Sequence, residues 1–511
     1  MMDHPEEGRT VRRSVWLCRA PLLIAAALIG AISAYTLTRL VFANSPRNPW
    51  ESVEVLEGWR SLRGMPVYEL VPGGHSTHVY GALAPWVQGE IFRWVGPNNI
   101  SGRLLTLMSA LLLVTLLAVT MRGQRSAWYL AFAWVLILSV NHRSGEYFAE
   151  NRPDMPALMF ATVGMLLIGY GEEKRRVNWV LLGSACLVAG FFFKQTAFIF
   201  AGVPLVALVL RWKRPARSEL ITACIPMTVA VGVILTLRIT SPIVYYYMID
   251  IPKAFALDWI RTARCFWNLL IDSPLFLIVF GEWIVSDEGS VRRDPRVFWL
   301  IAVLAVTIPF SALTAGKSGG ADNSLLPALL AMMTFCILRL PRLLDRLENP
   351  ASPVNARLIL GSFVAILMLM TAFPHMTRSY NPIASLPDWD GEYWEAVSVA
   401  RGLPGKVICP EDPTIALYAK GYAGQNVSLE NDTHLVNGYW PERPPEPMLA
   451  EIRAADHVVD VSHYPEVDEK LLHELGFERV EQVPLTPRCY QVWRRKASGP
   501  ETGSNHTAFN K

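Results

Sequence analysis

Long apolar runs between residues 20 and 372 limit what this chain can fold into more than any other feature of its sequence. A helix needs about twenty mostly apolar residues to cross the hydrocarbon core of a bilayer, where every backbone polar group must be hydrogen-bonded internally. The runs lie at residues 20–42, 104–121, 127–140, 156–170, 179–193, 197–210, 220–239, 269–285, 297–313, 325–338 and 358–372. They predict a mainly α, polytopic membrane helix bundle of about eleven spans.

Composition divides the chain into two bodies. Only 18% of the residues are charged, against about 25% in ordinary soluble domains, and the deficit is concentrated in the apolar runs. We expect a cytoplasmic N-terminus (1–19), a transmembrane domain (20–377) with a long first outer loop (43–103), a small C-terminal α/β soluble domain (378–496) and a disordered tail (497–511). The α/β prediction rests on strand patterns at 406–410, 457–462, 477–483 and 489–495, and on helical patterns at 391–401, 414–420 and 468–475.

Basic residues orient the bundle, because cytoplasmic loops of membrane proteins are enriched in lysine and arginine. They cluster at residues 9–19, 122–125, 174–176, 211–217, 292–296 and 339–357, which fall on one side if the number of spans is odd. The C-terminal domain is then expected outside the cytoplasm, in a bacterial periplasm or an organelle lumen. A net charge of +3 with no basic stripe gives no reason to expect a nucleic-acid partner.

The first outer loop carries the candidates for acid–base chemistry. In residues 48–69, Val55, Trp59 and Leu62 form one apolar stripe at helical spacing, and Gly64 follows as a stop signal. We expect a helix lying in the membrane interface with this stripe facing the bilayer. A carboxylate near its start, Glu51, could act as a general base toward a hydroxyl. The alternative is a favourable charge at a helix N-terminus.

Glu54, one turn further along, is the second candidate for the catalytic carboxylate, although it lies farther round the helix. Before the second span, Arg103 either contacts a lipid phosphate or anchors the helix end. Arg152 and Asp154 open the fourth span. The guanidinium of Arg152 suits a phosphate, whereas Asp154 is equally well explained as a helix N-cap.

Lys194 lies between two apolar runs with almost no loop. A charge at such a depth is costly and suggests function, with snorkelling of the side chain to the surface as the alternative. In the last outer loop, Lys317, Asp322 and Asn323 accompany Gly316, Gly319 and Gly320. Glycines allow a close backbone approach to a ligand, so an anion or sugar contact is expected here, with a plain flexible hairpin as the alternative.

Acidic and basic candidates on one membrane face suit a phosphate-bearing lipid donor. The basic side chains would stabilise the charge of the leaving phosphate, and one carboxylate would activate the acceptor hydroxyl. No cofactor is required by this scheme. A divalent metal stays open, because Mg²⁺ binds through one or two carboxylates together with phosphate.

The ordered set of outer segments resembles the GT-C membrane glycosyltransferases. The closest likeness is to the glycosyltransferase family 39-like branch that includes protein O-mannosyltransferases, aminoarabinose transferases and RgtA/B/C/D-like proteins. The matching segments are an acidic residue followed by G-x-P-x-Y (51 and 64–68), YGALAP (80–85) with GR (102–103), NRPD (151–154), and FKQT (193–196) with GADNSLLP (320–327).

The resemblance implies transfer of a sugar from a polyprenyl-phosphate donor, with inversion, at the outer membrane surface. It casts Glu51 as the carboxylate of the catalytic first loop, and Arg152, Lys194 and Lys317 as phosphate contacts. The family usually has Asp, often Asp–Glu, at the first position. Here the residues are Trp50, Glu51 and Ser52, so the identity of the base stays open, as does a diverged, inactive member.

We therefore expect a glycosyltransferase in a membrane, most simply the bacterial inner membrane, whose partners are a polyprenyl-phosphate sugar donor, membrane lipids and a lipid, glycan or protein acceptor. One rival is a transporter or flippase, which predicts inverted repeats and polar residues at mid-span. The other is a membrane scaffold without catalytic activity that carries the C-terminal domain.

Overall fold

The computed structural model describes residues 5–43, 45–69, 79–122, 127–145, 147–211, 216–286, 295–348, 353–373, 389–422, 424–433, 443–461, 467–480 and 490–496. The tail expected after residue 496 lies outside these ranges, as does most of the link before the C-terminal domain.

Each of the apolar runs forms helix. The elements of the membrane body are α1 (Pro5–Phe42), α2 (Pro49–Leu62), α3 (Leu83–Val95), α4 (Asn99–Arg122), α5 (Ala127–Leu138), α6 (Val140–Arg143), α7 (Asp154–Glu173), α8 (Val177–Phe193), η1 (Gln195–Gly202), α9 (Val203–Leu210), α10 (Arg217–Thr240), α11 (Pro242–Tyr245), η2 (Tyr246–Asp250), α12 (Ile251–Ala254), α13 (Trp259–Ile271), α14 (Pro274–Ser286), α15 (Pro295–Ala315), η3 (Asp322–Leu325), α16 (Leu326–Glu348) and α17 (Val354–Ala372). The prediction of a polytopic helix bundle is therefore confirmed.

Fewer helices than expected are long enough to cross a bilayer unaided. Within the described ranges, 7 pass by length and composition, in α1, α4, α7, α10, α15, α16 and α17. The predicted span at 269–285 is a pair of helices, α13 and α14, bent by 76° relative to each other. If this pair counts as one span, the described ranges hold up to 8 spans. The runs at 127–140, 179–193 and 197–210 form shorter helical elements, so the expected count of about eleven is not reached by length alone.

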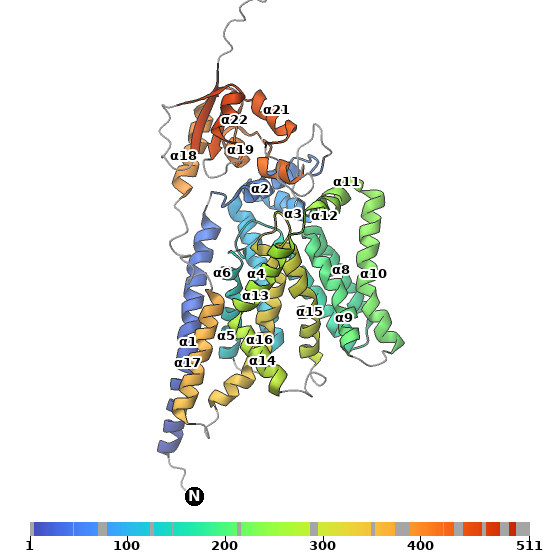
Figure 1. Ribbon diagram of the computed structural model, residues 1–511, viewed down its shortest axis with the longest axis vertical. Coiled ribbons are helices and arrows are strands. Elements are labelled where there is room, and N and C mark those ends of the chain that lie inside the picture. Colours follow the sequence, from blue (N-terminus) through green and yellow to red (C-terminus); the bar gives the residue numbers. More distant parts are fainter. Residues whose placement is uncertain are drawn as a thin grey trace, which may run out of the picture.

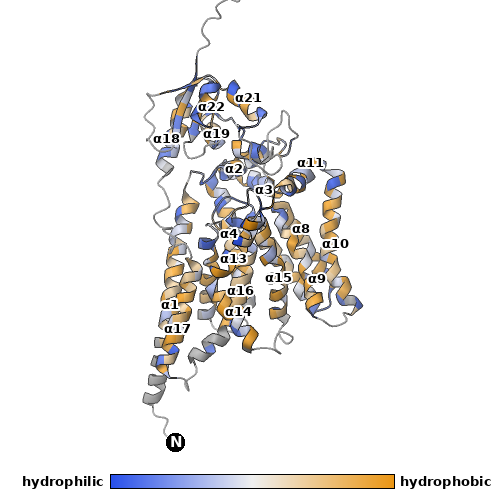
Figure 2. Ribbon diagram, in the orientation of Figure 1, coloured by the Kyte–Doolittle hydropathy of each residue, from blue (hydrophilic) through white to orange (hydrophobic). Residues whose placement is uncertain are grey.

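One continuous apolar core holds the body together. It draws side chains from α1, α4, α5, α7, α8, α15, α16 and α17, with Leu113, Phe335 and Met368 among those with no exposed surface. Most outward-facing positions are also apolar, as expected where lipid replaces water. Figure 2 shows hydrophobic residues along the helices of the body. Hydrophilic residues gather toward the end that carries the C-terminal domain.

The C-terminal domain is a small α/β unit, as predicted. Its elements are α18 (Trp389–Gly402), β1 (Val407–Ile408), α19 (Pro413–Lys420), α20 (Val427–Thr433), α21 (Glu446–Ala454), β2 (His457–Val461), α22 (Glu469–Glu474), β3 (Phe477–Arg479) and β4 (Tyr490–Arg495). The strand order is β1-β2-β4-β3, with β1 and β2 parallel and the other pairs antiparallel. Apolar side chains on the two faces of this sheet form two separate clusters.

Helix α2 forms where the sequence predicts it. The Asn48 side chain caps its first turn by accepting a hydrogen bond from the Glu51 N–H at 3.2 Å, and Pro49 fits the first helical position. Gly64, at φ 68°, follows its end in a left-handed conformation.

The expectation that the apolar stripe of α2 faces the bilayer is wrong. Val55 is fully buried, and together with Trp59 and Leu62 it joins a cluster that also contains Phe92 of α3 and Leu417 of α19. Helix α3 and the C-terminal domain together cover the apolar stripe that we expected to face lipid. Local periodicity identified the buried face but could not identify what buries it.

The first outer loop and the C-terminal domain lie at the same end of the body, opposite the N-terminus (Figure 1). The contacts agree, because Ser52 of α2 donates a hydrogen bond to Asp412, 360 residues later in the chain. At the opposite end, Arg211 pairs with Glu172, which brings two of the predicted basic loops together. The structure thus separates an end rich in candidate site residues from an end rich in arginine.

Candidate active site

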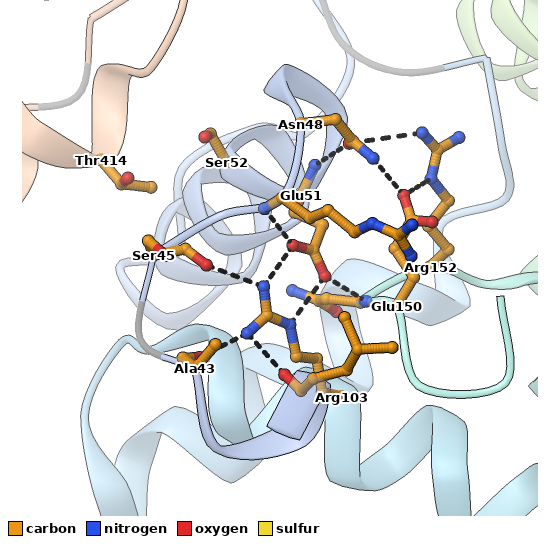
Figure 3. A network of polar contacts seen from close by, with 12 residues as sticks. Ala43, Ser45, Asn48, Glu51, Ser52, Arg103, Glu150, Arg152 and Thr414 are labelled. Atoms are coloured by element: carbon orange, nitrogen blue, oxygen red, sulfur yellow. Dashed lines mark hydrogen bonds and ion pairs between the residues drawn. The ribbon is translucent and has the colours of Figure 1, made fainter. Parts of the chain in front are cut away.

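Glu51 and Arg103 form a buried ion pair with every polar atom engaged (Figure 3), and we call it the closed pair. The Glu51 carboxylate accepts from the N–H of Arg47 at 2.6 Å, the N–H of Asn151 at 2.7 Å, and Arg103 Nε at 2.9 Å and Nη2 at 2.5 Å. Arg103 also donates to the carbonyls of Leu40, Ala43 and Ser45. The pair ties together the end of α1 and the starts of α2, α4 and α7.

The charge of Glu51 is strongly stabilised. Burial alone would raise the pKa of this carboxyl, but the charge and hydrogen bonds of Arg103, together with the N–H groups of Arg47 and Asn151, hold it below its ordinary value. Its exposed fraction is 0%. A carboxylate with a lowered pKa and four hydrogen bonds already accepted from the protein is a weak base, so this geometry fits a structural role better than a catalytic one.

A second polar network lies beside the closed pair. Arg152 Nε donates to Glu150 Oε1 at 2.8 Å, and Asn48 Nδ2 donates to the same oxygen at 2.5 Å (Figure 3). The Arg152 guanidinium also lies 5.4 Å from the ring centroids of both Trp50 and Tyr147. Arg152 is therefore buried yet fixed in orientation between two rings, which is an arrangement suited to presenting a planar cation.

Asp154 and Lys194 form a second buried ion pair, which we call the open pair. Lys194 Nζ donates to Asp154 Oδ1 at 2.6 Å and lies 4.6 Å from the centre of the Tyr80 ring. Within the described residues, the other Asp154 oxygen accepts no hydrogen bond. An ammonium has three N–H donors, and one of the three binds Asp154 here. The open pair can therefore accept another polar partner without losing its own contact.

The position of Lys194 follows from how α8 ends. Its backbone is extended, at φ −151° and ψ 129°, so α8 stops and η1 starts with the side chain between them. Burial would lower the pKa of this amine, but Asp154 and Tyr80 raise it above its ordinary value. Lys194 is thus a buried, permanently charged ammonium rather than a snorkelling side chain, since its exposed fraction is 8%.

Two tyrosines connect the open pair to the acidic face of α2. The Tyr68 hydroxyl donates to the carbonyl of Tyr80 at 2.6 Å, and the ring of Tyr80 faces Lys194. Burial raises the pKa of Tyr68, and the charges of Glu57 and Glu54 raise it further. Glu54 therefore lies within electrostatic reach of the same tyrosine that contacts the Lys194 side of the site. It is 2% exposed.

Two motif glycines allow the segments to approach. A Cβ on Gly81 would lie 2.0 Å from the Phe192 carbonyl oxygen, and a Cβ on Gly102 would lie 2.1 Å from Asn151 Oδ1. Gly81 also donates its N–H to the carbonyl of Phe193, next to Lys194. Glycine at these positions lets the first loop reach the ends of α7 and α8.

The last outer loop lies apart from these contacts. Lys317 Nζ donates to the carbonyl of Pro252 at 2.9 Å, and Asp322 acts electrostatically on Cys265 of α13. Asn323 is buried at the start of η3. Among the described residues, no hydrogen bond or ion pair of Lys317, Asp322 or Asn323 reaches the closed or the open pair. The structure brings together Glu51, Arg103, Arg152, Asp154 and Lys194 but not these three.

Sequence reasoning missed Asn48, Glu150, Tyr68, Tyr80 and Asp412 as parts of the arrangement. Asn48 could have been found, because Asn–Pro before a periodic segment is a helix-start signal. Tyr68 and Tyr80 lie inside the quoted motifs, but a tyrosine carries no pattern that marks it as a link. Asp412 belongs to another domain, and nothing in the sequence near it points to α2.

Comparison with known proteins places the fold. No protein-family model matches the chain, and no curated protein sequence matches it. The crystal structure of ArnT from Cupriavidus metallidurans in the apo state superposes with a TM-score of 0.54 at 14% identity, covering 93% of this chain and 99% of that one. The same protein bound to undecaprenyl phosphate gives 0.51 at 12% identity, covering 94% and 99%.

A third solved structure, an oligosaccharyltransferase from Archaeoglobus fulgidus in complex with Zn and sulfate, gives a TM-score of 0.42 at 13% identity over 89% of this chain and 69% of that one. This score is too low to support any conclusion. The two ArnT structures span nearly the whole chain, C-terminal domain included. The chain therefore has the fold of the two ArnT structures, a polytopic helix bundle with a C-terminal domain.

Proposed function

We propose that this protein is an inverting glycosyltransferase that moves a sugar from a polyprenyl-phosphate donor to an acceptor hydroxyl at the outer face of the membrane. The observation that carries the proposal is the link between a buried ammonium and a carboxylate-bearing helix. Lys194 lies over the Tyr80 ring, Tyr68 donates to the Tyr80 carbonyl, and the charges of Glu57 and Glu54 on α2 act on Tyr68. All of these groups lie at the end of the bundle that carries the C-terminal domain (Figure 1). A cation for phosphate and a carboxylate for a hydroxyl are the two groups that this reaction requires.

In the proposed reaction, the acceptor oxygen attacks the anomeric carbon while the bond from that carbon to the phosphate oxygen breaks. The hydroxyl proton passes to a carboxylate, and the lipid phosphate leaves with the electron pair. A single displacement of this kind inverts the anomeric carbon. Lys194 stabilises the negative charge that develops on the leaving phosphate, because a fixed cation in a buried site interacts strongly with such charge.

We assign the base role to Glu54 rather than to Glu51. Glu51 is committed to Arg103 and two backbone N–H groups. Glu54 lies one turn along the same helix, on the side of Tyr68. Arg152 is proposed as a second phosphate contact, since its guanidinium is held in orientation by Trp50 and Tyr147. No step is assigned to Lys317, Asp322 or Asn323, because Lys317 binds α12, Asp322 acts on α13, and Asn323 is buried at the start of η3.

The ArnT fold supports this proposal, because a structure of that protein holds undecaprenyl phosphate, which is a polyprenyl phosphate. We propose the bacterial inner membrane as the location, with the site and the C-terminal domain on the extracytoplasmic side. The acceptor is proposed to be a hydroxyl on a lipid, a glycan or a protein. The scheme uses no metal ion, so chelation by EDTA is expected to leave transfer unchanged.

The test uses membrane vesicles that contain the full chain, supplied with a panel of radiolabelled polyprenyl-phosphate sugars. Wild type is expected to form a labelled product with at least one donor. Glu54→Gln is expected to lower the rate by about 10²–10⁴-fold, the usual contribution of a general base. Glu173→Gln is the matched control, since that carboxylate is 62% exposed at the far end of α7. No product from wild type with any donor contradicts the proposal.

The same vesicles separate the rival functions. A flippase would move the labelled donor across the bilayer without forming a new glycosidic bond, and a scaffold would do neither. Measuring donor accessibility on both faces together with product formation therefore distinguishes all three outcomes.

A further inference from the structure

One buried carboxylate of the C-terminal domain reaches into α2. Asp412 Oδ1 accepts hydrogen bonds from Ser52 Oγ of α2 at 2.7 Å and from Thr414 Oγ1 of α19 at 2.5 Å. Figure 3 shows Ser52 on α2 and Thr414 on the neighbouring segment of the C-terminal domain. The Thr414 hydroxyl is in turn 2.8 Å from the hydroxyl of Tyr393 in α18. All four side chains are buried.

The contact surrounding Asp412 is mostly apolar. Leu417 and Tyr418 of α19 pack against Val55, Leu56 and Trp59 of α2. A second polar contact across this face is longer: Asn426 Nδ2 donates to the Pro49 carbonyl at 3.4 Å. An apolar interface alone would bury α2 well but would tolerate small rotations. A buried carboxylate with one hydroxyl partner on α2 fixes one orientation, because leaving it unpaired is costly.

We propose that Asp412 is a positioning residue for the active site, which holds the turn of α2 that carries Glu51 and Glu54 at a fixed rotation. This inference rests on the proposed function for its catalytic meaning. Ser52 lies between the two carboxylates in sequence, and each residue of a helix turns its side chain by about 100°. A rotation of α2 that released Ser52 would therefore swing Glu54 away from Tyr68 and would strain the closed pair.

The electrostatics of Asp412 give this contact a pH dependence. Burial raises the pKa of the Asp412 carboxyl to about 6, and the negative charge of Glu51 on α2 adds to the shift. The other titratable groups that face it are Tyr393 of α18, Cys409 beside β1 and Tyr418 of α19. Because the folded pKa is above the ordinary value of 3.8, ionisation of the buried Asp412 lowers the stability of the fold as the pH rises through about 6. The hydrogen bonds from Ser52 and Thr414 favour the ionised form, so the contact itself is stronger above that pH.

The experiment compares wild type, Ser52→Ala, Ser52→Thr, Asp412→Asn and the double variant Ser52→Ala with Asp412→Asn, all as full chains in vesicles. The control is Glu446→Gln, because Glu446 is a carboxylate of the same domain whose side chain is 70% exposed. Two readouts are used: hydrogen–deuterium exchange of the α2 amides, and the kcat and KM of sugar transfer measured from pH 5 to 8.

Ser52→Ala and Asp412→Asn are each expected to speed exchange of the α2 amides by about tenfold. Each is also expected to lower kcat while leaving the KM for the donor nearly unchanged. The double variant is expected to match the single ones, because both act on one contact. Ser52→Thr restores the hydroxyl and is expected to restore both readouts. The step in kcat near pH 6 is expected to disappear in Asp412→Asn and to persist in Glu446→Gln.

Unchanged exchange and unchanged kcat in both single variants would overturn the inference. Faster α2 exchange with a pH profile identical to wild type would reduce Asp412 to a packing contact and also overturn it. If wild type transfers no sugar but α2 exchange responds as expected, the proposed function fails while the control of α2 by Asp412 stands. The exchange data thus separate failure of the positioning role from failure of the enzyme assignment.

Discussion

The closed pair and the open pair are both buried carboxylate–cation pairs at the same end of the bundle. They differ in how many of their hydrogen-bond donors and acceptors the protein leaves unused. In the closed pair, Glu51 accepts four hydrogen bonds and Arg103 donates to three carbonyls besides. In the open pair, Lys194 binds one oxygen of Asp154, and the other oxygen accepts no hydrogen bond from the described residues.

The difference shows how burial alone misleads. All four charged side chains are less than one-tenth exposed, so each satisfies the rule that a charge at this depth suggests function. The two pairs differ in whether their hydrogen-bonding positions are all used within the protein. A pair whose donors and acceptors all bind the protein stabilises the fold, whereas a pair with unused positions can still bind a ligand. The predictions below test that division.

The largest expected effect is on stability at the closed pair. Glu51→Gln leaves the Arg103 charge buried without its counter-charge, which typically costs about 3–5 kcal/mol. We expect the free energy of unfolding, followed by tryptophan fluorescence in detergent, to fall by that amount. Glu90→Gln is the control, because the Glu90–Arg93 pair lies in the same loop but is 40% and 58% exposed, where a pair contributes little. A stability loss equal to that of the control would contradict the assignment.

The open pair is expected to show the opposite balance. Lys194→Met should lower the rate of sugar transfer by about 10²–10³-fold, the usual effect of removing one group that stabilises developing charge. Its stability loss should be smaller than that of Glu51→Gln, since Asp154 has a single recorded hydrogen bond to lose. Lys174→Met, at an exposed lysine beyond α7, serves as the control. Full transfer activity in Lys194→Met would remove Lys194 from the site.

The glycine beside the closed pair provides a smaller test. An alanine Cβ at position 102 would meet the Asn151 side chain at 2.1 Å, and overpacking of this kind costs about 1–3 kcal/mol. Gly232→Ala is the matched control within α10, where a Cβ meets nothing within 4 Å, so alanine should stabilise the helix slightly. Thermal unfolding of both variants measures the contrast. Equal midpoints would mean that the first loop is not held against α7 as described.

The smallest expected effect is on pH dependence. Because the folded pKa of Glu51 is below its ordinary value of 4.5, its stabilising contribution is complete above that pH and is lost as the pH falls through the lowered value. The difference in unfolding free energy between wild type and Glu51→Gln should therefore be constant from about pH 7 to pH 5 and shrink in stronger acid. A difference that shrinks already near pH 6 would mean that the closed pair is weaker than its geometry indicates.

The sequence predicted the helices well and their partners poorly. Apolar runs report a length and a face, so α1, α4, α7, α10 and the later spans follow directly from them. The alternation in the C-terminal region likewise predicted β1, β2, β3 and β4 close to where they lie. Both signals are local, and local signals survive without knowledge of tertiary contacts.

The site depends on contacts that are remote in sequence. Arg103 meets Glu51 across 52 residues, and Asn151 meets it across 100. A motif could suggest that these residues matter, but not that Glu51 would be saturated. The expectation that the apolar stripe of α2 faces lipid was wrong for the same reason. A stripe covered by other parts of the protein looks the same in the sequence as one covered by lipid.

The 360 residues between Ser52 and Asp412 also separate them in time during synthesis. At about 5–20 residues per second, a ribosome needs roughly 18–72 s to travel from one to the other. Through that interval, the stripe of Val55, Trp59 and Leu62 can pack against Phe92 of α3 but not yet against α19. The nascent chain therefore passes through a stage in which this apolar face is only partly covered, before the C-terminal domain completes the contact.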